Sequence, residues 1–530
     1  MDDNSEKNPV KRQLAKAELV WQRRDGWGKV INDAYEYAIP QRMTSKPGVA
    51  VANDKIFDMT APLGTMVFAG NLQKDLFPPA SAKFHFTPGP IFQQRLDKSE
   101  LSTMRRELQR TSARIDPFFQ TGDFDTAANE ACWDLAIGTG AILPVHGDQH
   151  QPLYFVNVPF EHLATSVDAW GRTTFVSWKQ VLTIAEIHDG FKDGGKFSKE
   201  FLERVKSKPN EEIVLYQDFF KTTLGWSWVA YTGKLCDEFI IHERSKTQPI
   251  SVGRYSRAPG EPYGRGPVLL ALASIKTLNK AQELALRSAA VQLLGIWAYR
   301  AGGTFNPDTV NIGAGEFWPM LSTGGVLGPD VQRIDPATGR LDVARVVIDG
   351  MREDIKGVLM DTRIAPEQGT PRSASEIVAT LKDRADTNIG AYGRLSREFM
   401  PVLAPRAAEI LYGKGYLDTP LELNELLFQV KVRSPMQQAL DAQILDNFVT
   451  YFDLTAAIAG PENIDEHVIP DEVLGHSRTV LDIPEHMVPS EAERTKIRAN
   501  KREAFAAQQA ATFALEAAKV DPDSARDTIQ

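Results

Sequence analysis

Two long helical patterns enclose a Gly/Pro-rich stretch in the middle of this chain. In both, apolar residues recur at spacings of three and four, which marks one face of an α-helix. In 267–294 this face comprises Val268, Ala271, Ile275, Leu278, Ala281, Ala285, Ala289 and Leu293. In 341–361 it comprises Leu341, Ala344, Ile348, Met351, Ile355 and Val358. The stretch 295–340 has no helical period, so the pattern predicts a helix pair that carries a loop-rich module at its tip.

Further helices are predicted on the amino-terminal side. The ranges with helical periodicity are 11–38, 58–76, 96–114 and 125–137. Gly26 and Gly28 weaken the first helix, and Pro40 ends it. The alternation at 83–86 favours a short strand after the break at Pro78.

The pattern changes to short strands between 141 and 250. Aromatic and β-branched residues dominate these runs, as expected of a β-sheet. The predicted strands lie at 142–145, 153–156, 174–178, 213–220 and 226–231, with helical segments at 183–191 and 199–206 interrupting the sheet. Strands and helices in separate runs predict an α+β fold.

A loop at 363–372 precedes a third long helix. Ser373 and Glu376 form a capping box, which marks the start of that helix. We expect Pro401 and Pro405 to kink or end it. The last predicted helix spans 491–519 and is rich in Ala, Glu, Lys and Arg.

Composition limits the class of protein. The chain has 530 residues, enough for two to four domains, and 42% hydrophobic and 24% charged residues, which is ordinary for a soluble globular protein. No apolar run approaches the length of a membrane span, and the amino terminus is too charged for a signal peptide. Cys132 and Cys236 match no metal spacing and suit a reducing cytoplasm, so we expect both in the core.

The sequence carries no strong catalytic motif. The stretch 190–196 has the spacing of a phosphate-binding loop, but Phe197 replaces the hydroxyl residue and a helical pattern precedes it, which favours a plain turn. His146 and His150 are conceivable metal ligands, although Gly147 and Asp148 between them favour a hairpin turn. A hydrolase that uses His146, His150 and His162 is one alternative. The sequence implies no cofactor, metal or catalytic residue.

Basic residues gather along the central helices and the loop that follows them. Lys276, Lys280 and Arg287 lie off the apolar stripe of the first helix. Arg363 and Arg372 bracket the loop, and Lys382 and Arg384 follow it. In a monomer, each is most simply a solvated surface residue. In a ring of identical subunits, the copies of each residue form a circle of positive charge that can contact phosphates. The net charge of −9 argues against a protein that coats nucleic acid tightly.

Several segments, in this order, resemble the podovirus head-to-tail connector, or portal, family of tailed bacteriophages. The similar segments are Tyr37-Ala38-Ile39-Pro40, 55–61, 72–79 with Phe84, 262–267 leading into 271–279, 372–377 and Ser434-Pro435-Met436-Gln437-Gln438-Ala439. Together they span about 20–505. Ser373 stands where threonine is commoner in the family, and both hydroxyls can cap a helix.

The resemblance implies a mainly helical portal fold with an α/β wing, a two-helix stem, a loop-rich clip and a helical crown. The implied parts are the wing at 1–266, stem helices at 267–294 and 341–361, the clip at 295–340, the tunnel loop at 362–372, the long helix and the base of wing and crown at 373–485, and the crown helix and tail at 486–530. It implies a dodecameric ring at one capsid vertex through which double-stranded DNA is packaged and ejected.

The resemblance also implies partners and site residues. The clip, with Trp297, Tyr299, Phe305, Phe317 and Trp318, docks terminase and later the tail adaptor. The DNA channel includes Arg363, Gln368, Arg372, Lys382 and Arg384. Major capsid, scaffold and internal core proteins are further expected partners, without membrane insertion. The protein is expected to be part of the virion after assembly in the host cytoplasm. It is not expected to be an enzyme.

Two glycines in the second stem helix need a reason, because each costs about 1 kcal/mol relative to alanine. We expect Gly350 and Gly357 to permit a close helix–helix approach or a kink. The main alternative function is another oligomeric virion or scaffold protein without a DNA channel, which a closed centre or a different symmetry distinguishes.

Overall fold

The structure is a computed structural model with mixed helix and sheet, which confirms the α+β class. It describes residues 8–43, 55–78, 83–148, 150–192, 194–233, 238–294, 296–299, 331–334, 341–361, 390–417, 428–432, 447–455, 457–458, 473–474, 477, 489 and 491–520.

The helices are α1 (Pro9–Ala38), α2 (Thr60–Leu76), α3 (Pro90–Arg95), α4 (Lys98–Thr121), α5 (Phe124–Ile137), α6 (Ile184–Gly190), α7 (Lys199–Ser207), α8 (Pro267–Leu294), α9 (Leu341–Val358), α11 (Met400–Gly413) and α15 (Glu491–Val520), with 3-10 helices at Pro40–Arg42 and Phe160–His162. The strands are β1 (Phe84–Pro88), β2 (Thr139–His146), β3 (Leu153–Asn157), β4 (Leu163–Val167), β5 (Thr173–Thr183), β6 (Glu212–Thr222), β7 (Gly225–Thr232), β8 (Ile241–Ser245), β9 (Ser251–Arg254), β10 (Ile296–Tyr299), β11 (Val331–Ile334) and β12 (Phe428–Val432).

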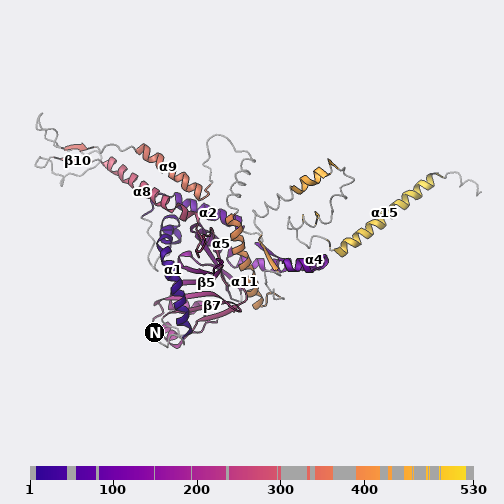
Figure 1. The fold of residues 1–530 in the computed structure, drawn as a ribbon, viewed down its shortest axis with the longest axis horizontal. Coiled ribbons are helices and arrows are strands. Elements are labelled where there is room, and N and C mark those ends of the chain that lie inside the picture. Colours follow the sequence, from indigo (N-terminus) through magenta and orange to yellow (C-terminus); the bar gives the residue numbers. More distant parts are fainter. Residues whose placement is uncertain are drawn as a thin grey trace, which may run out of the picture.

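The strands between 139 and 254 form two antiparallel sheets, with β5 and β7 below α2 and α5 in the view of Figure 1. A five-stranded sheet has the order β4-β5-β6-β7-β8, and a three-stranded sheet has the order β3-β2-β9. The chain passes through α6 and α7 between β5 and β6, so the predicted helical interruption of the sheet is confirmed. Strands β4, β8 and β9 were not among the predicted strands.

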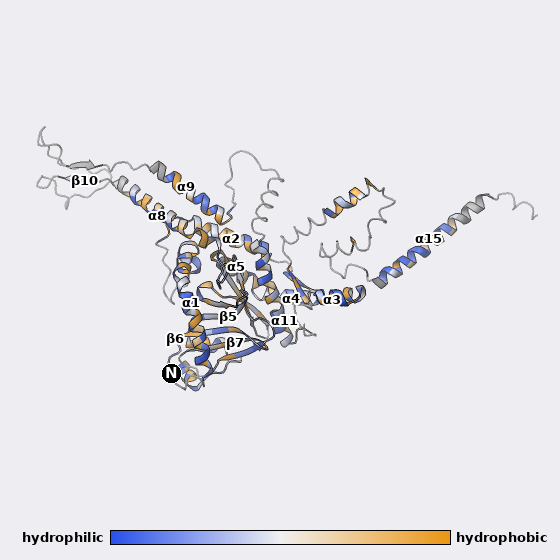
Figure 2. Ribbon diagram, viewed as in Figure 1, coloured by the Kyte–Doolittle hydropathy of each residue, from blue (hydrophilic) through white to orange (hydrophobic). Residues whose placement is uncertain are grey.

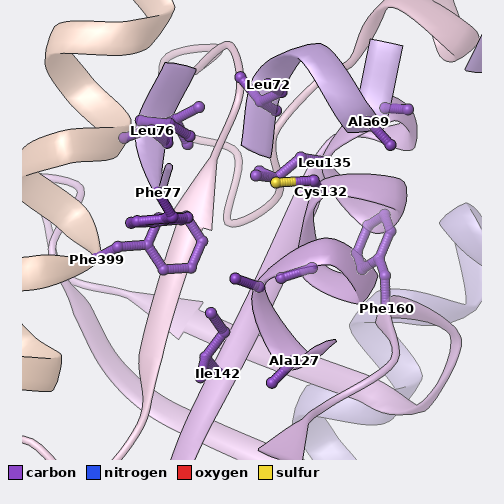
Figure 3. Close-up of a cluster of buried hydrophobic side chains, with 14 of the residues drawn as sticks. Ala69, Leu72, Leu76, Phe77, Ala127, Cys132, Leu135, Ile142, Phe160 and Phe399 are labelled. Atoms are coloured by element: carbon purple, nitrogen blue, oxygen red, sulfur yellow. The ribbon is translucent and has the colours of Figure 1, made fainter. Parts of the chain in front are cut away.

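The main core joins α2, α5, α8, α11 and the three-stranded sheet (Figure 3). Phe77 after α2 makes edge-to-face contacts with Phe124 of α5 and with Phe399. Burial of large apolar side chains contributes about 25 cal/mol per Å² of apolar area, so this cluster is the main source of stability. Cys132 lies fully buried in it, as expected, whereas Cys236 lies outside the described residues.

Helix α1 is held to the body by two buried carboxylates. Near its start, Gln13 Nε2 donates to Asp218 Oδ2 on β6 at 2.9 Å, and Tyr231 donates to the same oxygen at 2.8 Å. Near its end, Tyr35 donates to Asp134 Oδ1 on α5 at 2.6 Å. Burial raises the pKa of Asp218 to about 6, although the hydrogen bonds from Gln13 and Tyr231 oppose the shift. The docking of α1 is therefore sensitive to the charge of Asp218.

Two predicted helix ends need correction or qualification. Helix α4 continues past Arg114 to Thr121, because Ile115 and Phe119 extend its buried face into the core. Residues 390–398 are helical, and a break at Phe399 precedes Pro401, as expected of that proline. The helix does not end at Pro405, which lies within α11. Ser373, Glu376 and the segment 434–439 lie outside the described residues.

Candidate assembly surface

Helices α8 and α9 form an antiparallel pair that projects from the body, with the β10–β11 hairpin at its far end (Figure 1). The predicted stripe of α8 packs inward, since Val268, Ile275 and Leu278 are buried. Ile348 and Ile355 of α9 are buried as well. The predicted bounds of α8 are confirmed, whereas α9 ends at Val358, and Met360 after it has a φ of 54°.

Glycines before α8 set the direction in which the pair leaves the body. A Cβ on Gly264 would lie 2.2 Å from the carbonyl oxygen of Gly138, and one on Gly266 would lie 2.2 Å from that of Ala136. The backbone N–H of Gly266 donates to the carbonyl of Ile137 at 2.7 Å. The chain thus runs against the end of α5 backbone to backbone, which no residue with a side chain permits.

A polar cluster fixes the root of the pair. Asn279 of α8 accepts hydrogen bonds from the backbone N–H groups of Phe57 and Asp58, at 2.7 and 3.2 Å. Arg352 of α9 donates to Asp58 Oδ2 through Nε and Nη2, at 2.9 and 2.8 Å. The segment ahead of α2 therefore holds both helices of the pair.

The charge of Asp58 is stabilised in this cluster. Burial alone raises the pKa of Asp58, but hydrogen bonds from Thr60 and from Arg352 outweigh it and lower the pKa below its usual value. The same carboxylate raises the pKa of Arg352. Both groups are therefore charged at neutral pH, and the contact is a charge-assisted hydrogen bond.

Helix α2 and the end of α9 approach closely at a glycine that the sequence did not single out. A Cβ on Gly64 would lie 2.7 Å from Leu359 Cδ1. A Cβ on Gly350 or Gly357 would meet nothing within 4 Å. Close packing within the described chain thus explains Gly64 and does not explain the two glycines of α9.

The outward faces of the pair carry exposed apolar side chains, and Figure 2 shows hydrophobic residues beside hydrophilic ones on both helices. Leu270 of α8 is 79% exposed and Val346 of α9 is 72% exposed. Leu284, Leu286 and Val347 are also exposed. Apolar side chains repeated along a projecting element are typical of a protein–protein contact. We call the faces that carry these five residues the assembly surface.

The three predicted cations of α8 all have carboxylate partners. Lys276 pairs with Asp33 of α1, and its ammonium lies 5.7 Å from the centre of the Tyr37 ring. Lys280 and Arg287 both pair with Glu283, at 2.9 and 2.6 Å. The three cations thus share two carboxylates within the chain.

The remaining predicted site residues fall mostly outside the described part of the chain. This holds for Arg363, Gln368, Arg372, Lys382, Arg384, Phe305, Phe317 and Trp318. Trp297 and Tyr299 lie in β10, opposite Arg333 and Val331 of β11.

The candidate catalytic histidines have structural surroundings. His146 ends β2, and Asp148 accepts backbone hydrogen bonds from His150 and Gln151, so the predicted hairpin turn is present. His162 lies in a short 3-10 helix, and burial lowers its pKa. The described residues contain no group of three His, Cys, Asp or Glu side chains placed to bind a metal. Gly190, which begins the stretch 190–196, ends helix α6 rather than a strand, and a phosphate-binding loop follows a strand.

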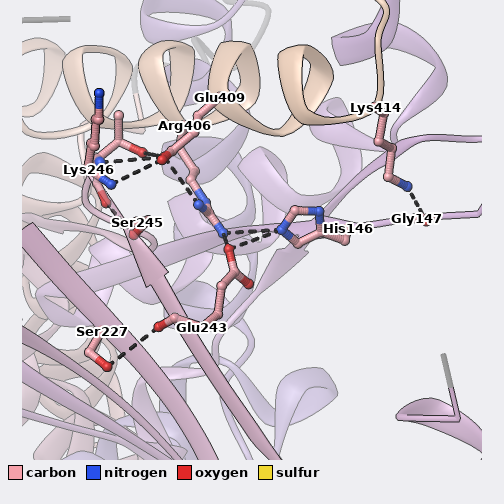
Figure 4. Close-up of polar contacts among 10 residues, drawn as sticks. His146, Gly147, Ser227, Glu243, Ser245, Lys246, Arg406, Glu409 and Lys414 are labelled. Carbon is pink, nitrogen blue, oxygen red and sulfur yellow. Dashed lines mark hydrogen bonds and ion pairs between the residues drawn. The ribbon is translucent and has the colours of Figure 1, made fainter. Parts of the chain in front are cut away.

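His146 instead belongs to an ionic cluster that joins α11 to the sheets (Figure 4). Its Nε2 lies 3.1 Å from Glu243 Oε1 of β8, and Arg406 of α11 donates to that oxygen at 2.6 Å. Arg406 also contacts Glu409 at 3.2 Å. Burial raises the pKa of Glu243, but His146 and Arg406 outweigh it and lower the pKa to about 2. The cluster anchors α11.

Comparison with known proteins gives one family. A family model described as bacteriophage head to tail connecting protein matches residues 11–488. No curated protein matches the chain. Similar solved structures include a chain titled "Virion of native gene transfer agent (GTA) particle", with 11% identity, a TM-score of 0.32, and coverage of 79% of this chain and 94% of that one. Another, "Neck of empty GTA particle computed with C6 symmetry", has 12% identity, a TM-score of 0.30, and coverage of 84% and 98%.

None of the described helices is both long and apolar enough for a membrane span.

Proposed function

This chain belongs to the bacteriophage head-to-tail connecting protein family, and on that premise we propose that it is a portal protein. It forms a ring at one vertex of the capsid, through which double-stranded DNA is packaged and later ejected. It is a structural component of the virion, assembled in the host cytoplasm, and the hydrolysis of ATP belongs to a separate motor.

The observation that supports this proposal best is the assembly surface on the projecting helix pair. Leu270 and Val346 have no reason to be apolar in an isolated chain, since both side chains are largely exposed. A head-to-tail contact repeats until the rotation closes, and a closed ring leaves no such surface free. We propose twelve copies, the number that the resemblance to the portals of short-tailed phages implies.

The helix pair serves as the stem of this ring. Its root is fixed by Asp58 and Asn279, so the pair holds a set direction relative to the body. We propose 1–266 as the wing, 295–340 as the clip that docks terminase and then a tail adaptor, and 362–372 as the tunnel loop. The segment 373–485 forms the long helix and the base of wing and crown. The segment 486–530, which contains α15, faces the capsid interior as the crown, near capsid, scaffold and core proteins.

DNA must slide through the ring without being held. The net charge of −9 per chain disfavours strong binding to phosphates, and Lys276, Lys280 and Arg287 are already paired with carboxylates. Sparse cations at the tunnel loop, Arg363 and Arg372, then centre the duplex while retention stays weak. Particles with alanine at both positions are expected to package or retain DNA abnormally. If these particles behave like the wild type, Arg363 and Arg372 are ordinary surface residues.

Phage particles assembled without this protein test the role directly. The proposal predicts heads that contain no packaged genome and carry no tail, and supply of the protein from a plasmid restores both. Heads that fill with DNA in its absence contradict the portal role and favour a virion protein without a DNA channel.

A further inference from the structure

Three arginines converge where β9 leaves the three-stranded sheet. Arg254 ends β9, Arg257 follows three residues later, and Arg394 lies in the helical segment 390–398. Arg254 and Arg257 both donate to the carbonyl oxygen of Gly171, at 3.0 and 2.7 Å. Arg394 donates to the carbonyl of Tyr255 at 2.7 Å. Two guanidinium groups therefore meet at Gly171, and the third binds the backbone of Tyr255, between the residues that carry the first two.

The carboxylates of the described residues do not balance this cluster. Glu398 pairs with Arg254, 3.1 Å from its Nη2, and also accepts from the backbone N–H of Arg254 at 2.8 Å. Within the described part of the chain, Arg257 and Arg394 donate to backbone carbonyls and have no ion pair. Among the described residues, Glu398 is thus the one carboxylate that forms an ion pair with any of these three arginines.

The pKa of Arg254 reflects the same imbalance. Burial lowers it most, Glu398 raises it, and the neighbouring charges of Arg257 and Arg394 lower it again. Like charges this close disfavour one another unless an anion lies between them.

Arg254 also has donors without acceptors. Its side chain is only 4% exposed, and its Nε and Nη1 are buried with no hydrogen-bond partner among the described residues. A buried donor left unpaired is costly, and more so when it carries charge. Arg257 is exposed and Arg394 half-buried, so the cluster has a side that is open to solvent.

We propose that Arg254, Arg257 and Arg394 form a binding site for a phosphate group, either free phosphate or a phosphodiester. Guanidinium groups match phosphate oxygens with paired, charge-assisted hydrogen bonds. A phosphate offers more acceptor oxygens than a carboxylate and, when free, carries more charge, which suits an excess of two cations. All three arginines belong to one chain, so the site does not depend on ring formation or on the portal role.

Thermal unfolding of the full chain in different anions tests the site. The probe is sodium phosphate, compared with sodium acetate and sodium chloride at equal ionic strength. The expected result is a higher Tm in phosphate than in either other salt. Equal Tm values in phosphate and acetate overturn the proposal, and this comparison needs no variant to fold.

The variant Arg257→Ala/Arg394→Ala localises the effect. Both side chains donate only to backbone carbonyls among the described residues, so we expect the double variant to fold. Arg204→Ala in α7 is the matched control, because Arg204 pairs with Glu211 on another part of the surface. The double variant is expected to lose the extra stabilisation by phosphate and the control to keep it. An equal gain in all three proteins shows a general salt effect and overturns the site.

A short DNA duplex at low salt then identifies the source of the phosphate. Affinity that falls by about tenfold in the double variant and not in Arg204→Ala assigns a phosphodiester. If all three proteins bind the duplex equally, while phosphate stabilises the wild type and not the double variant, the ligand is free phosphate. If the double variant keeps both the stabilisation by phosphate and the affinity for the duplex, the proposal is contradicted.

Discussion

Arg352 of α9 and Asp58 ahead of α2 form a two-pronged contact, in which Nε and Nη2 donate to the same carboxylate oxygen at 2.9 and 2.8 Å. The backbone N–H of Asp58 also donates to Asn279 Oδ1 of α8. The contact ties the projecting pair to the body at its root. It gives the pair a fixed direction, which a symmetric ring requires of every copy.

Replacement of Arg352 by methionine is expected to loosen this root. The variant leaves the largely buried Asp58 carboxylate with fewer partners, and a hydrogen bond between charged groups contributes about 1.5–3 kcal/mol. The free energy of unfolding should fall by about 2 kcal/mol, and amide exchange in α9 should become faster. Urea denaturation and hydrogen–deuterium exchange measure these effects.

Arg345→Met is the matched control for that variant. Arg345 also lies on α9, but its side chain is 86% exposed and its pair with Asp349 is long, at 3.9 Å. An exposed pair of this kind contributes little. If the two variants lose the same stability, the root contact has no special role.

Asp218 makes the docking of α1 depend on pH. Its folded-state pKa of about 6 lies above the ordinary value of 3.8, so the folded protein binds this proton more tightly than the unfolded chain. The contribution of Asp218 to stability is therefore fully present below pH about 4 and is lost as the pH rises through about 6.

Asp218→Asn removes this titration and keeps a side chain of the same shape. Between pH 4 and 7, the difference in free energy of unfolding between variant and wild type should shift in favour of the variant as the pH rises. Denaturation at several pH values measures that difference. A difference that does not change with pH contradicts the raised pKa.

The assembly surface predicts the effect of charge on its apolar residues. Leu270→Asp/Val346→Asp places two carboxylates where neighbouring copies are proposed to pack, at side chains that contact little within one chain. Circular dichroism should remain that of the wild type, while light scattering should show loss of the large assembly. Leu224→Asp, at an equally exposed leucine in the β6–β7 turn, is expected to leave assembly unchanged.

Gly357 distinguishes packing between copies from packing within one. A side chain there meets nothing within 4 Å in the described chain, and leucine favours a helix over glycine by nearly 1 kcal/mol. Gly357→Leu should therefore fold with unchanged or higher stability, yet fail to assemble if a neighbouring helix approaches at that point. Rings of normal stability refute the packing role, and Gly26→Leu on α1, also free of contacts, serves as the control.

The sequence predicted those elements whose period is regular. Helix α8 has the predicted bounds because its apolar stripe continues through Ile275 and Leu278 without interruption. The end of α9 was overestimated, since the left-handed conformation of Met360 is a local backbone event that apolar spacing does not encode. Helix α4 was underestimated because its later buried residues, Ile115 and Phe119, follow a mainly polar stretch.

Contacts between distant residues could not be predicted in the same way. Asp58 and Arg352 are far apart in the chain, and nothing in one sequence pairs a particular carboxylate with a particular arginine. The segments 55–61 and 271–279 were singled out by the family resemblance, and the structure joins these two through Asn279. Gly64 gave no signal, because its role depends on where Leu359 lies.

Negative-stain electron microscopy of the purified protein is the measurement that decides whether it forms a portal ring. We expect rings with a central opening and twelve-fold symmetry, in which the helix pairs of neighbouring copies lie side by side. A closed dimer or tetramer without an opening would contradict both the assembly surface and the portal role.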